Sequence, residues 1–246
     1  MNITAFILTT LAGLSTLLGT IPIFIKTKTN KIIISALSFA AGVMITVSII
    51  DLIPEGINYL NKTFRLFPTI LITLIFIVIG IIISMTIDKY INKNREGELY
   101  KVGIISMIAI ILHNIPEGIA TYLSSEVNFK LGLSLTIAIA LHNIPEGISI
   151  AVPFYYGTKS RGKALIYTLA SALSEPLGAL LAYIFLSKII NNNIMGLLMS
   201  IIAGIMIQIS FYELLPTSLK YKNKKLTIIL FIIGMLFMIT SHILLK

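Results

Sequence analysis

The chain has 246 residues, of which 57% are hydrophobic and only 12% are charged, and its formal net charge is +9. This composition excludes a disordered chain and argues against an ordinary water-soluble domain. The sequence contains no cysteine, which excludes disulfides and thiolate metal sites.

Eight apolar runs follow one another along the chain, each long enough to cross a bilayer core of roughly 30 Å. Each is predicted to form a transmembrane helix, so the fold is expected to be all-α. The spans leave no room for a soluble domain, and residues 1–246 are expected to form a single transmembrane domain in the lipid bilayer. The predicted spans are about 3–25, 32–53, 68–87, 102–123, 131–153, 164–187, 194–215 and 226–245.

The basic residues are distributed unevenly between the two sides of these spans. The connections that follow spans 1, 3, 5 and 7 carry 14 of the 19 Lys and Arg residues. The positive-inside rule therefore predicts that these connections are cytoplasmic and that both termini lie outside the cell membrane. Topology explains the net charge, so no nucleic-acid partner is expected.

Spans 2 and 7 contain a weak repeat. The stretch "AGVMITVSIIDLIP" at 41–54 resembles "AGIMIQISFYELLP" at 203–216, and the two spans run in opposite directions. This predicts an inverted repeat that relates spans 1–3 to spans 6–8 around a central pair, a 3+2+3 arrangement found in transporters. One repeat moving against the other would alternate access to a site. The small residues equally suit internal helix packing or a homodimer.

Several charged residues lie away from the centres of the spans. Asp51 and Glu213 match in the repeat and lie near opposite membrane faces, which suits either the entrance and exit of a cation or structural interfaces. Glu55 lies past span 2 and is expected in a loop, at most at the outer mouth. His242 stands alone near the end of span 8 and is expected to pack rather than bind metal. The charged 88–101 connection is expected to be flexible.

The heptapeptide "HNIPEGI" occurs at 113–119 in span 4 and again at 142–148 in span 5. In each copy the histidine and asparagine precede the glutamate by four and three residues, so they share a helix face. Pro116 and Pro145 should kink the helices and free carbonyls towards a polar cavity, while Gly118 and Gly147 allow close helix approach. The candidate ligands are His113, Asn114 and Glu117 in span 4, and His142, Asn143 and Glu146 in span 5.

A third carboxylate, Glu175 in "LSEPLG", is expected near the centre of span 6, at the depth of both histidines. A charge at that depth costs at least about 2.5–3.5 kcal/mol, and three carboxylates without an intramembrane Lys or Arg would repel one another. A divalent cation resolves this. Imidazoles, amides and carboxylates suit Zn²⁺, Fe²⁺, Mn²⁺ or Co²⁺, and the ligands suffice for two ions bridged by Glu117 and Glu146. A purely structural polar network and a metal-free proton relay are the alternatives.

At these residues the chain resembles the ZIP (Zrt/Irt-like protein) family of divalent metal transporters, most of all its bacterial ZupT-like branch. The resemblance rests on eight spans, the "AGVM" and "AGIM" stretches, the paired "HNIPEG" and "SEPLG". It implies a binuclear centre and uptake into the cytoplasm. One site would use His113, Glu117, His142 and Glu146, and the other Asn114, Glu117, Asn143, Glu146 and Glu175. The His-rich cytoplasmic loop frequent in the family is missing here.

The sequence therefore predicts a transporter that takes up zinc as its leading substrate, with Fe²⁺, Mn²⁺ and Co²⁺ as further substrates and no resident cofactor. A metal-independent, proton-coupled carrier of another solute is the main alternative. An intramembrane metalloprotease is disfavoured because the chain lacks an H-E-x-x-H motif. No catalytic residues are therefore expected.

Overall fold

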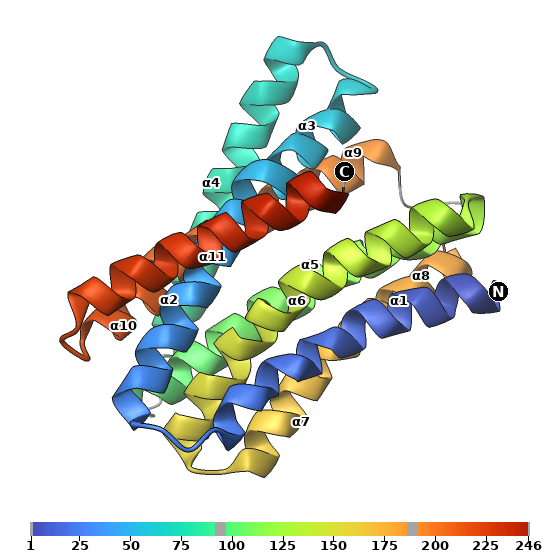
Figure 1. Ribbon diagram of the computed structural model, residues 1–246. Coiled ribbons are helices and arrows are strands. Elements are labelled where there is room, and N and C mark those ends of the chain that lie inside the picture. Colours follow the sequence, from blue (N-terminus) through green and yellow to red (C-terminus); the bar gives the residue numbers. More distant parts are fainter. Residues whose placement is uncertain (1, 92–96, 186–190, 246) are drawn as a thin grey trace.

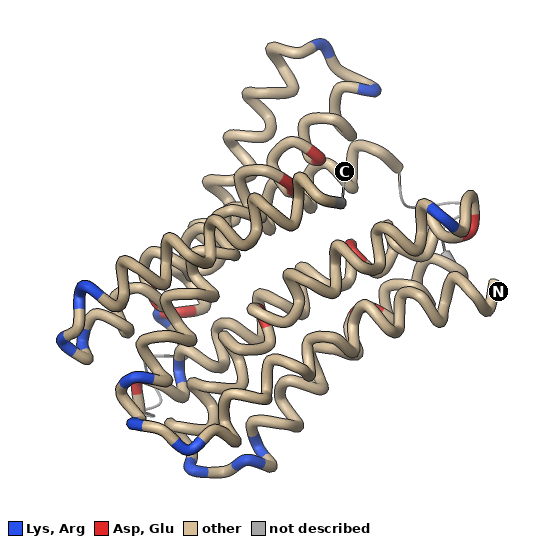
Figure 2. The backbone as a smooth tube through the Cα atoms, in the orientation of Figure 1, with Lys and Arg blue, Asp and Glu red and all other residues tan. Residues whose placement is uncertain are grey.

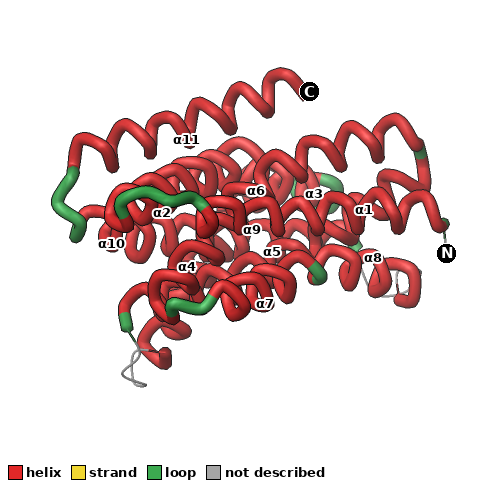
Figure 3. The backbone as a smooth tube through the Cα atoms, turned by 60° about the horizontal axis from the view of Figure 1, so that its bottom comes forward, coloured by secondary structure: helices red, strands yellow, loops and turns green. Residues whose placement is uncertain are grey.

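A computed structural model describes residues 2–91, 97–185 and 191–245 of the chain. Within these residues the chain forms helices and loops only (Figure 3). Eight helical stretches are long and apolar enough to cross a membrane, which confirms the eight predicted spans. They are Ile3–Phe24, Thr29–Asn61, Leu66–Tyr90, Glu98–Val127, Phe129–Thr158, Arg161–Ile184, Asn192–Leu219 and Lys224–Leu244.

Several spans are built from more than one helical segment. The segments in chain order are α1 (Ile3–Ser15), the 3-10 segment η1 (Thr16–Phe24), α2 (Thr29–Val47), the π-helical turn η2 (Ser48–Leu52), α3 (Ile53–Asn61), α4 (Leu66–Ile91), α5 (Glu98–Val127), α6 (Phe129–Thr158), α7 (Arg161–Ala172), α8 (Ser174–Phe185), α9 (Asn192–Ile209), the π-helical turn η4 (Ser210–Leu214), α10 (Leu215–Leu219) and α11 (Lys224–Leu245). Of the charged 88–101 connection, residues 92–96 lie outside the described residues.

The second span is longer than its sequence predicts. It passes through η2 and continues as α3 to Asn61, so Glu55 is helical and the expectation of a loop was wrong. The physical reason lies in Pro54, which occupies the first turn of α3. Proline suits the first turn of a helix, and the π-helical turn before it keeps the chain helical, since the N–H of Ile53 donates to the carbonyl of Ser48.

The inverted repeat is visible in the backbone and in the packing. The π-helical turns η2 and η4 are 162 residues apart, the offset that matches the two repeat stretches. Glycines let helices approach closely at equivalent places, since an added Cβ would meet the backbone of the facing helix. These contacts are Gly42 with Phe231, Gly204 with Ile77, Gly234 with Phe39, and Gly80 with Ile201.

The helices nevertheless pack into two bundles that each mix both repeats (Figure 1). The site bundle holds α1, η1, α5, α6, α7 and α8, and the flanking bundle holds α2, η2, α3, α4, α9, η4, α10 and α11. The bundles meet where α2 contacts α6 and α5 contacts α9. Spans 1–3 therefore do not form one packed unit. The expected movement of one repeat against the other stays a prediction.

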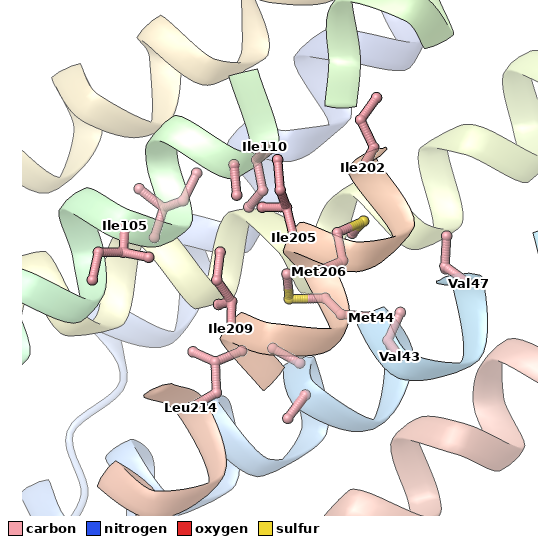
Figure 4. Close-up of a cluster of buried hydrophobic side chains, with 14 of the residues drawn as sticks. Val43, Met44, Val47, Ile105, Ile110, Ile202, Ile205, Met206, Ile209 and Leu214 are labelled. Carbon is pink, nitrogen blue, oxygen red and sulfur yellow. The ribbon is translucent and has the colours of Figure 1, made fainter. Parts of the chain in front are cut away.

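An apolar cluster fills part of the junction between the bundles (Figure 4). Ile105 and Ile110 of α5 pack there with Ile205, Met206 and Ile209 of α9. All five side chains are at most 3% exposed. The cluster thus closes the junction on one side of the centre of α5.

Most of the described Lys and Arg residues gather at one end of the molecule, away from the two chain ends, and fewer lie at the other end (Figure 2). That end carries the loops after η1, α6 and α10. The distribution matches the asymmetry seen in the sequence.

Candidate metal centre

The two heptapeptides lie on α5 and α6, which pack side by side in the site bundle. Both helices continue through their prolines, Pro116 and Pro145. The predicted close approach is confirmed: an added Cβ at Gly118 would meet the backbone of Glu175, and one at Gly147 would meet the backbone of Thr16. The predicted kinks and freed carbonyls stay predictions.

His113, Glu117 and His142 form the centre of the cluster. Each offers one ligand atom, and the three atoms lie within 4.8 Å of one another. Nε2 of His142 shares a hydrogen bond of 2.8 Å with Oε1 of Glu117, while Nε2 of His113 lies 3.4 Å from Oε2 of the same carboxylate. The histidines are 2% and 6% exposed, so this polar group is enclosed by protein.

Glu146 completes a four-residue set. Its Oε1 lies 3.6 Å from Nε2 of His113, its side chain is fully buried, and neither carboxylate oxygen has a hydrogen-bond partner within the described residues. Two ligand atoms on one tetrahedral Zn²⁺ are about 3.4 Å apart, given bonds of about 2.0–2.2 Å. The separations from His113 to Glu117 and Glu146 are therefore already those of a metal site.

Asn114 and Asn143 are oriented by equivalent carbonyls in spans 6 and 1. The amide nitrogen of Asn114 donates to the carbonyl of Ser171 at 3.4 Å, and that of Asn143 donates to the carbonyl of Ala12 at 3.0 Å. Both amide oxygens are buried and accept no hydrogen bond from the described part of the chain. An amide held by its nitrogen leaves its oxygen available as a metal ligand.

Glu175 lies in span 6, just after the single residue Leu173 that separates α7 from α8. Helix α7 ends at Ala172, and α8 begins at Ser174, so Glu175 lies in the first turn of α8. The amide of Asn143 donates to Oε1 of Glu175, and Oε2 is buried with no hydrogen-bond partner among the described residues. The contact of its backbone with Gly118 sets its depth.

The electrostatics of the cluster favour a cation. Glu117, Glu146 and Glu175 lie together in the site bundle, and the ion pairs recorded for the first two are with histidines. Burying unpaired charge is costly, and one buried carboxylate beside another is costlier. Imidazole nitrogens, amide oxygens and carboxylates together are the ligand set of a borderline divalent metal. The residues present fit such an ion.

Known proteins resemble the chain over most of its length. A family model described as "ZIP Zinc transporter" matches residues 93–242. The chain belongs to the ZIP family. Two relatives named "Zinc transporter ZupT", from Streptococcus mutans and Clostridium perfringens, are 41% and 39% identical to it; the matches cover 98% of this chain and 97% and 95% of the relatives. A third relative of that name, from Oceanobacillus iheyensis, is 39% identical over 98% of this chain and 97% of its own.

In this ZIP protein the cluster opens into a cavity between the two bundles, about 190 Å³ in volume. The site bundle contributes His113, Glu117 and His142 to its walls. The flanking bundle contributes acidic and histidine side chains too: Asp51, Glu55 and His242.

Asp51 was a sequence candidate, whereas Glu55 and His242 were not. Nδ1 of His242 lies 2.7 Å from Oδ1 of Asp51, so the expectation that His242 stands alone was wrong. The sequence hid this pair because 191 residues separate its members and only the packing of α11 against α2 unites them. A signal for Glu55 did exist, since "IPEG" at 53–56 is a third copy of the motif core.

Glu213, the repeat partner of Asp51, lies outside this cavity and has a different neighbour. Oε1 of Glu213 is 3.4 Å from Nζ of Lys101, which also forms an ion pair with Asp88. On α5, Ile105 and Ile110 of the apolar cluster lie between Lys101 and His113. Along α5, buried apolar side chains thus separate His113 from Lys101, the partner of Glu213.

Proposed function

We propose that this ZIP protein carries divalent metal, with zinc as its leading substrate, through the membrane by way of the cluster between α5, α6 and α8. The observation that carries the proposal is the enclosed group of His113, Glu117, His142 and Glu146, whose carboxylates form ion pairs only with histidines among the described residues. Relatives of nearly equal length named "Zinc transporter ZupT" support zinc as the substrate. Fe²⁺, Mn²⁺ and Co²⁺ have compatible ligand preferences.

The ligands suffice for two ions. One ion would be held by the two histidines and the carboxylates of Glu117 and Glu146. The other would take the two asparagine oxygens, Glu175 and the same bridging carboxylates. The two amide oxygens and Oε2 of Glu175, which have no hydrogen-bond partner among the described residues, support this second position. In this proposal the metals are cargo rather than resident cofactors.

We propose uptake towards the cytoplasm, in a cell membrane that the protein crosses with both termini outside. The basic end of the molecule supports a cytoplasmic position for the loops after η1, α6 and α10. Asp51 would then stand on the route of entering ions, because it lines the cavity that reaches the cluster. Glu213 would stand near the exit, beyond Lys101 and the apolar cluster.

The ion must lose its water to enter so enclosed a site, and the ligands replace that hydration. His142 must give up its hydrogen bond of 2.8 Å to Glu117 when an ion enters between them, because two ligands on one ion stand farther apart. Release needs the opposite side to open, which requires α5 to part from α9 where the apolar cluster now joins them. The protein thus exposes the metal site to the two sides of the membrane in two different conformations.

The test is uptake of radioactive Zn²⁺ by purified protein in liposomes. Glu117→Gln keeps the size of the side chain and removes the charge that both histidines contact, so uptake should fall to the level of empty liposomes. Glu126→Gln is the matched control, because Glu126 bonds to Tyr122 outside the cavity and should leave uptake intact. Competition by Fe²⁺, Mn²⁺ and Co²⁺ would rank the substrates.

Equal uptake by Glu117→Gln and the natural protein would overturn the assignment of this cluster. No metal uptake by folded natural protein under any metal or proton gradient would favour the metal-independent carrier instead. A protein of that kind would also show no thermal stabilisation by Zn²⁺, whereas a metal site predicts stabilisation that rises with metal concentration.

A further inference from the structure

Asp51 and Glu213 occupy equivalent positions in the two halves of the chain. Each lies in a π-helical turn, and each is followed three residues later by a proline at the start of a short helix. Their partners differ in kind. Asp51 pairs with the imidazole of His242, and Glu213 pairs with the ammonium group of Lys101.

This difference decides what each carboxylate can bind. A neutral imidazole has a lone pair and is a common metal ligand, so a histidine and a carboxylate together offer two donor atoms to one ion. A lysine ammonium group has three N–H donors and no lone pair. The ammonium group of Lys101 therefore already forms ion pairs with the carboxylates of Glu213 and Asp88. His242, by contrast, leaves the carboxylate of Asp51 able to bind a metal ion.

The surroundings of the Asp51–His242 pair also differ from those of Glu213. Both side chains are about one quarter exposed, at 26% and 24%, and both face the cavity that reaches His113 and Glu117. Glu55, one helical turn after Asp51, lines the same cavity. Among the described residues, none of those that line this cavity is a lysine or an arginine.

We propose that Asp51 and His242 form a separate divalent metal site on the flanking bundle, with Glu55 as a further carboxylate within the same cavity. The proposal rests on the proposed function in one respect, namely that divalent metal reaches this cavity. The site takes a borderline ion such as Zn²⁺ or Co²⁺ through Oδ1 of Asp51, Nδ1 of His242 and water. It holds an arriving ion opposite the enclosed cluster before the ion is transferred.

Only a small movement is needed to admit the ion. Oδ1 and Nδ1 are now 2.7 Å apart, a hydrogen-bond distance. Two ligands on a tetrahedral ion stand about 3.4 Å apart, so the pair must open by roughly 0.7 Å. Both side chains lie at a cavity wall rather than in packed core, which leaves them free to make that adjustment.

The competing interpretation is that the pair only fastens α11 to the turn η2. Both roles predict lower thermal stability after substitution, so stability alone does not separate them. Metal binding separates the two roles, because a purely structural ion pair would have no affinity for Co²⁺. The readout must therefore be the ion at this site, with the enclosed cluster disabled.

The first experiment uses the full-length protein in detergent, carrying Glu117→Gln and Glu146→Gln, titrated with Co²⁺ and followed by visible absorption. We expect about one Co²⁺ per chain to remain bound through nitrogen and oxygen ligands. Adding His242→Ala or Asp51→Asn should weaken this binding at least tenfold. Adding Glu213→Gln, which removes the same charge at the equivalent position, should leave it unchanged.

Failure of the doubly substituted protein to bind Co²⁺, or binding that His242→Ala leaves intact, would overturn the proposal. These outcomes are independent of the proposed function. Zinc uptake by the natural protein with no Co²⁺ at His242 would refute only this inference. Co²⁺ bound at His242 in a protein that transports no metal would refute only the transport proposal.

A second variant guards against misfolding of the doubly substituted protein. The chain has no cysteine, so His242→Cys in the otherwise natural sequence introduces a single thiol. Bound Co²⁺ should then give the intense near-ultraviolet absorption of a cobalt–thiolate bond, and Asp51→Asn should weaken that signal. A folded His242→Cys protein that binds Co²⁺ without thiolate absorption would contradict the site.

Discussion

Substitution of Gly118 by alanine should displace Glu175 from the metal cluster. An added Cβ at Gly118 would lie 2.8 Å from the Cα and carbonyl carbon of Glu175, short of the 3.4 Å at which ordinary contact begins, and nearer still to its carbonyl oxygen. These are backbone atoms, so no side chain can rotate away. Helices α5 and α8 must therefore separate by at least about 0.6 Å, since interiors are close-packed.

The energetic consequences for folding and for metal binding differ. Overpacking costs about 1–3 kcal/mol, while replacing a helical glycine by alanine returns about 1 kcal/mol, so Gly118→Ala should lose roughly 0–2 kcal/mol of stability. Ligands must be held within about 0.5 Å of their working geometry. We therefore expect at least about a tenfold loss of Zn²⁺ affinity, or about 1.4 kcal/mol.

Calorimetric titration of the detergent-purified protein with Zn²⁺ would measure this loss, beside uptake in liposomes. Gly162→Ala is the matched control, because the nearest atom to its added Cβ is Oγ of Ser160 at 3.9 Å. In a Glu175→Gln background, Gly118→Ala should lower affinity little further, since effects on one ligand do not add. Unchanged Zn²⁺ affinity and uptake in Gly118→Ala would refute the role of Glu175 as a ligand set in place by this contact.

Three further predictions concern the closed side, an amide ligand and protons. Lys101→Met should loosen the side near Glu213, so a cysteine introduced by Ile209→Cys should react faster with a water-soluble maleimide than it does when Lys101 is present; equal rates would contradict the role of the lysine. Asn143→Ala removes a proposed ligand oxygen and the donor to Glu175, and should lower Zn²⁺-dependent thermal stabilisation by about 1–3 kcal/mol, measured by melting with and without zinc. Zn²⁺ affinity should fall between pH 7.5 and pH 5, because protons compete for imidazole and carboxylate ligands; a flat calorimetric profile over that range would count against the cluster.

Patterns of local sequence determined much of the architecture. Eight long apolar runs have one stable solution in a bilayer, because a helix satisfies its own backbone hydrogen bonds. The inverted relation of spans 2 and 7 could also be read directly, and the equivalent glycine contacts of Gly42 and Gly204 agree with it. Which helices pack together could not be predicted from the sequence, because apolar helix surfaces can pack against many different partners.

The cluster of candidate metal ligands was likewise predictable from the sequence only in part. The sequence by itself placed His113 and Glu117 on one face of α5, and the identical motif on α6, since helical spacing fixes which neighbours share a face. Only the tertiary structure decided that His242 joins Asp51 and that Lys101 neutralises Glu213, because those contacts depend on how distant helices pack. The sequence determined the chemistry available at each depth of the membrane, and packing decided which of those groups meet.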